Sequence, residues 1–159
     1  MTSQRNNSAL TPLAWRDSWL LGIEAVDADH KELVRLLNLL LCAEGRCAES
    51  FAELETPRES APAGSSQLAH FSNLLGHLRD HFRREEALMM SLDYPDFELH
   101  ESEHRMQMAE LIDLRRHLSD RGSRCLSEES LEWIKRCSFD HFVTEDRRLA
   151  EFYLRELGA

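Results

Sequence analysis

Seven residues of this 159-residue chain have the types and the spacing of metal ligands. Two of the pairs are four residues apart, a spacing that puts both side chains on one helix face, about 6 Å apart. A third pair is five residues apart, and a single histidine ends the sequence Asp-Ala-Asp-His. The side chains are His30, His81, Glu85, His100, His104, His141 and Asp146. This set of imidazoles and carboxylates is large enough to hold two metal ions inside a bundle of helices.

Each pair falls on the apolar stripe of its helix rather than on the polar face. Burying imidazoles and carboxylates without partners costs several kcal/mol, so a converging set needs something that coordinates it. Chance is a weak explanation, because the histidine content predicts roughly 0.4 His-x3-His pairs at random. The chain has two such pairs, His77 with His81 and His100 with His104.

The ligand types narrow the choice of metal. Imidazole and carboxylate suit first-row metals, especially iron, manganese and zinc. No cysteine lies within the pattern, which argues against an iron–sulfur cluster. Seven side chains are too few for two six-coordinate ions, so bridging carboxylates and a bridging oxo or hydroxo group must fill most of the gap. One position would remain open for an external ligand.

The composition favours helices to position these ligands, since the chain has only 6 Gly and 4 Pro and is rich in Leu, Glu, Ala and Arg. Four helices are predicted: from Asp27, as the N-terminal cap, to about Gly45; from Gln67 to Ser91; from about Pro95 to 120; and from near Ser127 onward. Short links join the last three helices. The predicted fold is therefore all-α, an up-down-up-down four-helix bundle.

Two segments fall outside the helices of this predicted single domain, residues 1–159. Residues 1–25 are expected to form an N-terminal arm that packs on the bundle, because Trp15, Trp19, Leu20, Leu21 and Ile23 are too apolar for solvent. Residues 45–66 are rich in Ser, Ala, Pro and Gly and form a linker longer than helix hairpins need. The cysteines are expected to be free thiols. They are Cys42, Cys47, Cys125 and Cys137.

Charge and hydropathy exclude several classes of function. The net charge of −10 argues against binding to nucleic acid or to anionic lipid. The first twelve residues are polar and show no signal peptide, and no apolar run is long enough to span a membrane. A cytoplasmic protein is expected.

Several blocks of sequence occur in a specific order along most of the chain. They are Trp15–Ser18, Leu21–Ile23, Val26–His30, His81–Glu86, Leu88-Met89, Tyr94-Pro95, His100-x3-His104 and His141-x4-Asp146. In combination and order these motifs resemble the hemerythrin family, specifically its single-domain bacterial members.

The resemblance implies a non-haem di-iron centre that binds O2 reversibly inside a four-helix bundle. Three histidines would hold one iron, namely His100, His104 and His141. His30 and His81 would hold the other iron, which keeps the open position, and Glu85 and Asp146 would bridge the two. Family analogy also suggests an apolar wall that keeps water from bound O2, for which Leu33, Phe82 and Phe142 are candidates. Ordinary core packing explains those three residues equally well.

The chain departs from the family pattern at three points. The 45–66 linker is longer than usual and is either a neutral insertion, a docking segment or a lid. His77 stands where the family often has tyrosine, and is a hydrogen-bond partner of a ligand, a spare ligand or a partly exposed histidine. Glu145 competes with Asp146, because residue 145 follows His141 by one helical turn whereas residue 146 lies about 140° around the helix. The family pattern favours Asp146. The remaining histidines, His70 and His117, are expected at the surface.

Three functions are compatible with these residues. The leading hypothesis is reversible O2 binding, as a carrier, a store or a supplier to an oxygen-using enzyme. The second is an O2 or redox sensor that acts through a signalling partner. The third is a di-iron redox enzyme that acts on peroxide or nitric oxide or repairs iron–sulfur clusters, a class that the His-x3-Glu145 alternative resembles. O2 binding without catalysis is the expected activity.

Overall fold

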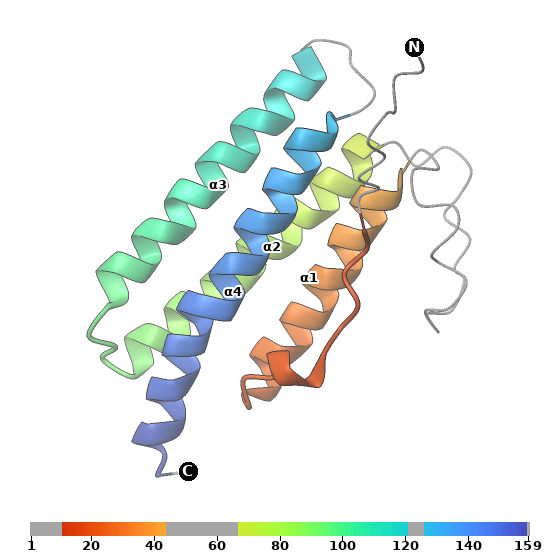
Figure 1. The fold of residues 1–159 in the computed structure, drawn as a ribbon. Coiled ribbons are helices and arrows are strands. Elements are labelled where there is room, and N and C mark those ends of the chain that lie inside the picture. Colours follow the sequence, from red (N-terminus) through yellow and green to blue (C-terminus); the bar gives the residue numbers. More distant parts are fainter. Residues whose placement is uncertain (1–10, 44–66, 121–125, 159) are drawn as a thin grey trace, which may run out of the picture.

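The computed structural model describes residues 11–43, 67–120 and 126–158. Within these ranges the chain forms four long α-helices and one short 3-10 helix, and it has no strand. The elements are η1 (Asp17–Trp19), α1 (Glu24–Cys42), α2 (Gln67–Ser91), α3 (Phe97–Asp120) and α4 (Glu128–Glu156). Consecutive helices run in opposite directions along one axis (Figure 1). The predicted all-α four-helix bundle is confirmed.

The helix bounds agree closely with the sequence pattern except at the start of α1. There Asp27 is not the cap, because α1 begins at Glu24 and the Asp27 amide already donates to the Ile23 carbonyl at 2.8 Å. The Asp27 carboxylate instead accepts from the backbone amides of Leu21 at 2.7 Å and Gly22 at 3.0 Å. Asp27 thus holds the preceding arm against the helix. By contrast, α4 starts next to Ser127 as expected, and the Ser127 side chain caps it by accepting from the Ser130 amide.

One half of the bundle is an apolar core, called here the apolar half. It contains the C-terminal parts of α1 and α3 and the N-terminal parts of α2 and α4. Its fully buried side chains include Leu37, Leu40, Phe71, Leu74, Leu111, Leu131 and Ile134. A smaller apolar cluster of Met89, Tyr94 and Leu149 closes the opposite end, near the turn between α2 and α3. The predicted ligands lie between these two apolar regions.

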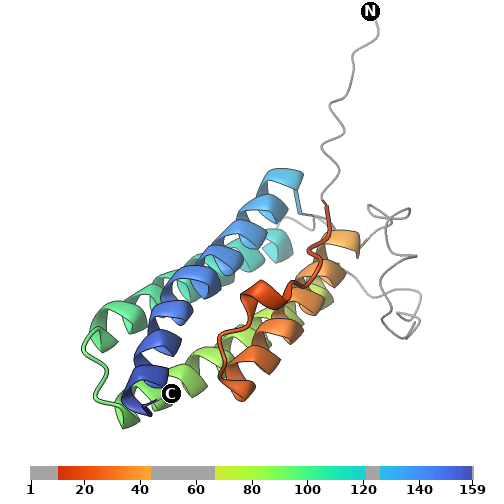
Figure 2. The ribbon, with the colours of Figure 1, turned by 60° about the horizontal axis from the view of Figure 1, so that its bottom comes forward.

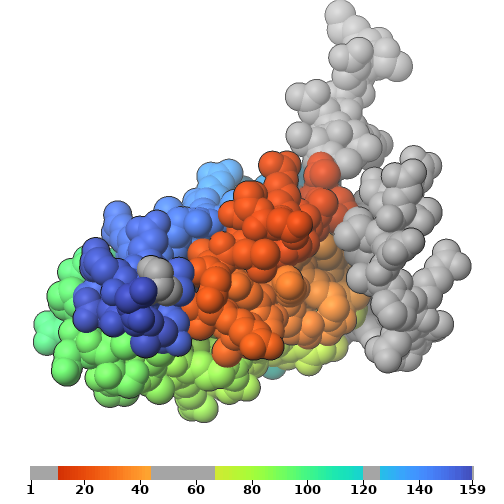
Figure 3. Space-filling view, turned by 90° about the horizontal axis from the view of Figure 1, so that it is seen from below, coloured from red at the N-terminus to blue at the C-terminus, as the bar shows by residue number. Residues whose placement is uncertain are grey.

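The described part of the arm packs along the bundle between α1 and α4 (Figures 2 and 3). Leu13 and Asn38 exchange two hydrogen bonds of 2.8 Å, and Arg147 donates to the Ser18 carbonyl at 3.1 Å. The Trp19 ring lies edge-on against Phe142, with ring centroids 5.9 Å apart. The arm is therefore attached to both helices.

Some expectations are corrected or lie outside the described residues. Leu20 is 41% exposed and does not join the packed face of the arm. Cys42 and Cys137 are not in disulfides. The 45–66 linker, residues 1–10 of the arm, Cys47 and Cys125 lie outside the described residues. No described helix combines the length and apolar character that a membrane span requires.

Candidate metal centre

All seven predicted ligands converge on one layer of the bundle, called here the ligand layer. Every helix contributes to this layer, and each of the seven side chains is at most 9% exposed. The residues are His30 on α1, His81 and Glu85 on α2, His100 and His104 on α3, and His141 and Asp146 on α4. Helical spacing places the members of each pair on one face, and the packing of the four amphipathic faces brings the pairs together.

Asp146 lies at the middle of the ligand layer. Its Oδ2 atom faces His30 Nε2 at 2.9 Å and His81 Nε2 at 3.4 Å. Its Oδ1 atom faces the other side, with His100 Nε2 at 3.2 Å and His141 Nε2 at 3.1 Å. Each oxygen of this one carboxylate therefore faces a different pair of histidines.

Glu85 is the second carboxylate between the two sets of histidines. Its Oε2 atom lies 3.5 Å from His81 Nε2, 3.8 Å from His100 Nε2 and 3.3 Å from His104 Nε2. Both Glu85 oxygens are buried and have no hydrogen-bond partner among the described residues. A buried carboxylate in this state is costly unless a cation or a proton neutralises it.

The seven residues divide into two overlapping groups whose ligand atoms lie within 4.8 Å of one another. The five-residue group consists of Glu85, His100, His104, His141 and Asp146. The four-residue group consists of His30, His81, Glu85 and Asp146. Both carboxylates belong to both groups, which is the arrangement that two neighbouring ions with shared bridging ligands require.

The electrostatic surroundings differ between the histidines of the ligand layer. Burial lowers the pKa of His81, but the carboxylates of Glu85, Asp146 and Asp29 outweigh burial and raise it to about 10. Burial and the neighbouring imidazoles of His141 and His100 lower the pKa of His104 to about 2. The two residues differ because His81 faces three carboxylates, whereas His104 is surrounded mainly by other imidazoles.

The two carboxylates behave differently as well. Burial, followed by the negative charge of Asp146, raises the pKa of Glu85 well above its ordinary value. Burial alone would also raise the pKa of Asp146, but contacts with His141, His100 and His30 lower it well below its ordinary value. Two buried carboxylates this close repel one another, and a cation between them removes that repulsion.

The buried atoms themselves fit a metal. Four buried ligand atoms are in contact with one another or with Glu85 but form no hydrogen bond of good geometry among the described residues. They are His100 Nε2, His104 Nε2, His141 Nε2 and Asp146 Oδ1. The ligand atoms of this group lie within 4.8 Å of one another, and imidazole and carboxylate are the ligands that iron, manganese and zinc accept. The donor set present therefore matches the requirements of a first-row metal site.

The structure distinguishes the two carboxylates that follow His141. Asp146 points into the ligand layer and is 1% exposed. Glu145 points outward, and its side chain is 24% exposed and pairs with Arg148 at 3.2 Å. A helical wheel favours Glu145, because residue 145 lies on the same helix face as His141. In the structure, however, His141 and Asp146 reach the ligand layer from different faces of α4.

The other histidines lie outside the ligand groups. His77 is half-buried and donates from Nε2 to the Asp29 carbonyl at 2.8 Å, and its ring stacks parallel to His81 with centroids 6.4 Å apart. His117 is exposed, as expected, and pairs with Asp113 one turn away at 3.5 Å. His70 is half-buried rather than a surface group.

The three candidate wall residues are buried in the large apolar cluster. The Phe142 ring lies 4.6 Å from the His30 ring, and the Phe82 ring stacks on His104 at 3.9 Å. Leu33 is 2% exposed and belongs to the same cluster as both rings. The wall of the ligand layer on this side is therefore apolar and closed, and a role in binding O2 stays a prediction.

Three polar residues next to the ligands were not predicted from sequence. Asp29 Oδ2 lies 3.2 Å from His81 Nδ1, and Arg84 donates two hydrogen bonds of 2.8 Å to the Asp29 carboxylate. Glu86 Oε1 lies 3.0 Å from His104 Nδ1. These contacts join different helices, so no spacing within one helix signals them. The adjacency of Asp29 to His30, and of Arg84 and Glu86 to Glu85, was the only available hint.

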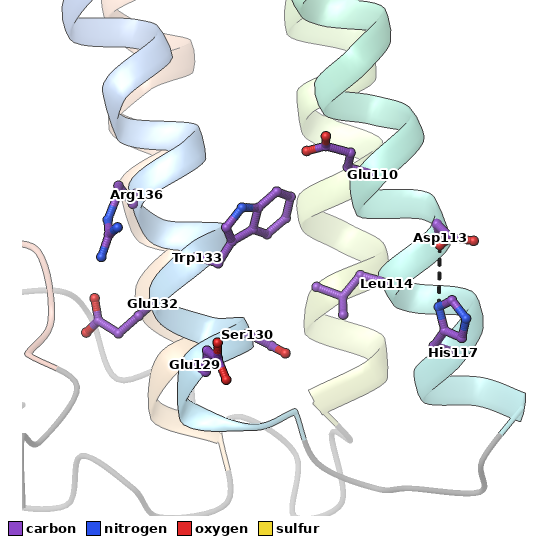
Figure 4. Close-up of a pocket in the computed structure, with 9 residues that line it drawn as sticks. All are labelled: Glu110, Asp113, Leu114, His117, Glu129, Ser130, Glu132, Trp133 and Arg136. Carbon is purple, nitrogen blue, oxygen red and sulfur yellow. Dashed lines mark ion pairs between the residues drawn. The ribbon is translucent and has the colours of Figure 1, made fainter.

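A surface groove lies away from the ligand layer, between α3 and α4 in the apolar half (Figure 4). It has a volume of about 660 Å³ and contains none of the seven ligand residues. The Trp133 ring projects into it from α4, opposite Glu110 and Leu114 of α3. The groove is therefore separate from the candidate metal centre.

The bundle and its buried ligand layer define a class, the helical-bundle proteins that bind cations through histidines and carboxylates. Residues 21–153 match the hemerythrin family, described as the hemerythrin HHE cation binding domain. The chain therefore belongs to the hemerythrin family. It is similar to a bacteriohemerythrin of Stenotrophomonas maltophilia (strain R551-3), with 24% identity over 139 residues, which cover 87% of this chain and 80% of that protein. No solved structure gives a significant match. The family and the buried cluster together indicate a site for iron.

Proposed function

We propose that this protein binds O2 reversibly at a di-iron centre formed by the seven residues of the ligand layer. The observation that carries the proposal is the position of Asp146, whose two oxygens face different histidine pairs. A carboxylate in that position suits a bridge between two ions better than a ligand to one. Membership of the hemerythrin family and the likeness to a protein named bacteriohemerythrin support iron and O2 as the metal and the ligand.

The two groups suggest how the irons are divided. His100, His104 and His141 would hold one iron, and His30 and His81 would hold the other. Glu85 and Asp146 would bridge them, with an oxo or hydroxo group as a further bridge. The four-residue group has one imidazole fewer than the five-residue group. The open position for O2 is therefore assigned to the iron held by His30 and His81.

When bound, an iron pair would supply the electrons that O2 takes. The protein residues hold that pair and control access to it. The carboxylates of Glu85 and Asp146, each on a residue that is 1% exposed, would balance part of the charge of the irons. Phe142 covers His30, and Trp19 of the arm packs on Phe142. We assign to these rings, together with Phe82 and Leu33, the exclusion of water from the open position.

The test is a cycle of reduction and oxygenation of iron-loaded protein. We expect two irons per chain, charge-transfer absorption in the near ultraviolet and visible, loss of this absorption on deoxygenation of the reduced protein, and its return in air over repeated cycles. Irreversible oxidation of the iron within the first cycle would contradict O2 carriage and would favour a di-iron redox enzyme. A stoichiometry of one iron per chain would contradict the shared-carboxylate arrangement.

A further inference from the structure

A carboxylate outside the seven ligands contacts one of them directly. We propose that Asp29, fixed by Arg84, is a positioning residue that orients His81 and so sets the iron affinity of the four-residue group. This inference rests on the proposed di-iron centre. It adds a contact from α1 and a salt bridge at the protein surface to the machinery that holds the iron.

The contact between Asp29 and His81 fixes how the imidazole can act. Asp29 Oδ2 lies 3.2 Å from His81 Nδ1. An ionised carboxylate only accepts hydrogen bonds, so Nδ1 carries the proton. The other nitrogen, Nε2, faces the ligand layer and lies 3.4 Å from Asp146 Oδ2 and 3.5 Å from Glu85 Oε2. A bound metal ion would replace the proton on Nε2 and take its lone pair. Hydrogen bonds of this kind fix the tautomer of a metal-binding histidine and make it a stronger donor.

Asp29 is itself held by two contacts from α2. Arg84 Nε and Nη2 each donate to a different Asp29 oxygen at 2.8 Å, which is the bidentate arrangement that restricts a carboxylate most strongly. The His77 ring donates to the main-chain carbonyl of Asp29 at 2.8 Å. Both the backbone and the side chain of Asp29 are thus tied to the helix that carries His81. This explains His77 without making it a ligand.

The other group has an anchor of a different kind. Glu86 Oε1 accepts from His104 Nδ1 at 3.0 Å. Among the described residues, Glu86 forms no ion pair with an arginine within 4.0 Å, whereas Asp29 is clamped by Arg84. The four-residue group has fewer imidazoles, so it depends more on the orientation of each one. The bidentate contact from Arg84 therefore supports the four-residue group, in which the orientation of each imidazole matters more for iron affinity.

The role of Asp29 can be tested by changing Arg84, because the Arg84 side chain is 51% exposed and its replacement leaves the buried core unchanged. The variants are Asp29→Ala, which removes the acceptor, Asp29→Asn, which keeps the shape and removes the charge, and Arg84→Met, which releases the clamp. The matched control is Arg83→Met, since Arg83 is the neighbouring residue and its ion pair within the described residues is with Asp80, at 4.0 Å on the surface.

The measurements are iron per chain in competition with a chelator, the charge-transfer spectrum, and the melting temperature of the metal-free protein. Asp29→Ala should lower the affinity for one of the two irons by about 10- to 100-fold, so that chelation leaves one iron per chain. Asp29→Asn and Arg84→Met should show smaller losses in that order, and Arg83→Met none. The metal-free melting temperature of Arg84→Met should equal that of the wild type.

Each result bears on a different claim. If the wild type holds two irons and Asp29→Ala and Arg84→Met hold two irons with unchanged affinity and spectrum, the positioning role is wrong. If the variants lower the melting temperature of the metal-free protein as much as that of the iron-loaded protein, Asp29 is a structural residue and the inference is also wrong. If the wild type itself does not hold two irons, the proposed function fails instead.

Discussion

The apolar half of the bundle, around Leu37, Leu74 and Ile134, is filled by side chains that need no partner. The ligand layer beside it buries seven side chains, several of whose polar atoms have no partner among the described residues. The same four helices form both regions, and burial is equally complete in both. The regions differ in what burial does to the free energy of folding.

Burial of apolar side chains stabilises the apolar half by itself, at roughly 25 cal/mol per Å² of apolar surface removed from water. In the ligand layer burial is costly, because each unpartnered polar group has lost its hydrogen bonds to water. The apolar half therefore provides the stability that holds the ligand layer in place before iron binds. Iron binding would then offset the free-energy cost of the buried polar groups, so that the ligand layer contributes to the stability of the folded chain.

The largest effect on iron binding is expected from replacing Asp146, one of the two carboxylates shared by both ligand groups. Asp146→Ala removes the residue that faces four of the five ligand histidines, so we expect loss of both irons and of O2 binding. Glu145→Ala is the matched control. It removes a partly exposed carboxylate that pairs with Arg148, so it should keep both irons and change stability by less than about 0.5 kcal/mol. Iron analysis of the two purified variants decides the matter, and two irons in Asp146→Ala would refute the bridging role.

Removal of iron should affect the ligand layer far more than the apolar half. Iron at about 1,000 times its dissociation constant stabilises the folded chain by about 4 kcal/mol, which corresponds to roughly 8–16 °C in melting temperature for a domain of this size. Hydrogen exchange should rise first at amides near His100 and His141 and last near Leu37. Equal melting temperatures with and without iron would mean that the metal does not offset the cost of the layer.

A cavity in the apolar half should weaken the fold without touching the iron. Leu37 is fully buried on α1, seven residues beyond His30. Leu37→Ala should cost about 2–5 kcal/mol in free energy of unfolding. Because the cavity is remote from the ligands, the cost should be the same for the metal-free and iron-loaded forms, with two irons per chain retained. Chemical denaturation of both forms measures this, and iron loss in the variant would show that the two regions are coupled.

Four members of the ligand layer were predictable from the geometry of a single helix, whereas His30 and the pair His141 and Asp146 were predicted from the family resemblance. His81 and Glu85, or His100 and His104, must share a helix face whatever the helix packs against. The bounds of α2 and the start of α4 near Ser127 followed from equally local signals. Local rules thus account for the helices and for most of the candidate site.

Contacts between helices were not predictable in the same way. Asp29 reaches Arg84 and His81 across the boundary between α1 and α2, and Asp27 turns back to the arm instead of capping its helix. The sequence does not specify the rotation of one helix against another, which decides these pairings. Likewise, only the packed bundle shows that Asp146 rather than Glu145 faces the histidines.

The smallest expected effect concerns a thiol where the two regions meet. Cys137 lies on α4, one helical turn before His141. Burial, together with the negative charge of Glu110, raises the pKa of the Cys137 thiol from 9.0 to about 11.

At pH 8 the thiolate fraction of Cys137 should be about 100-fold lower than that of an unshifted thiol, because each pKa unit changes the thiolate population tenfold. Only the thiolate reacts with an alkylating agent, so the reaction should be slowed accordingly. Alkylation followed by mass spectrometry should show slow modification of Cys137 in the folded chain, with the rate rising as the pH approaches 11. An alkylation rate equal to that in the unfolded chain would show that Cys137 is accessible to solvent in the folded protein. The packing of α3 against α4 would then fail to exclude water next to the ligand layer.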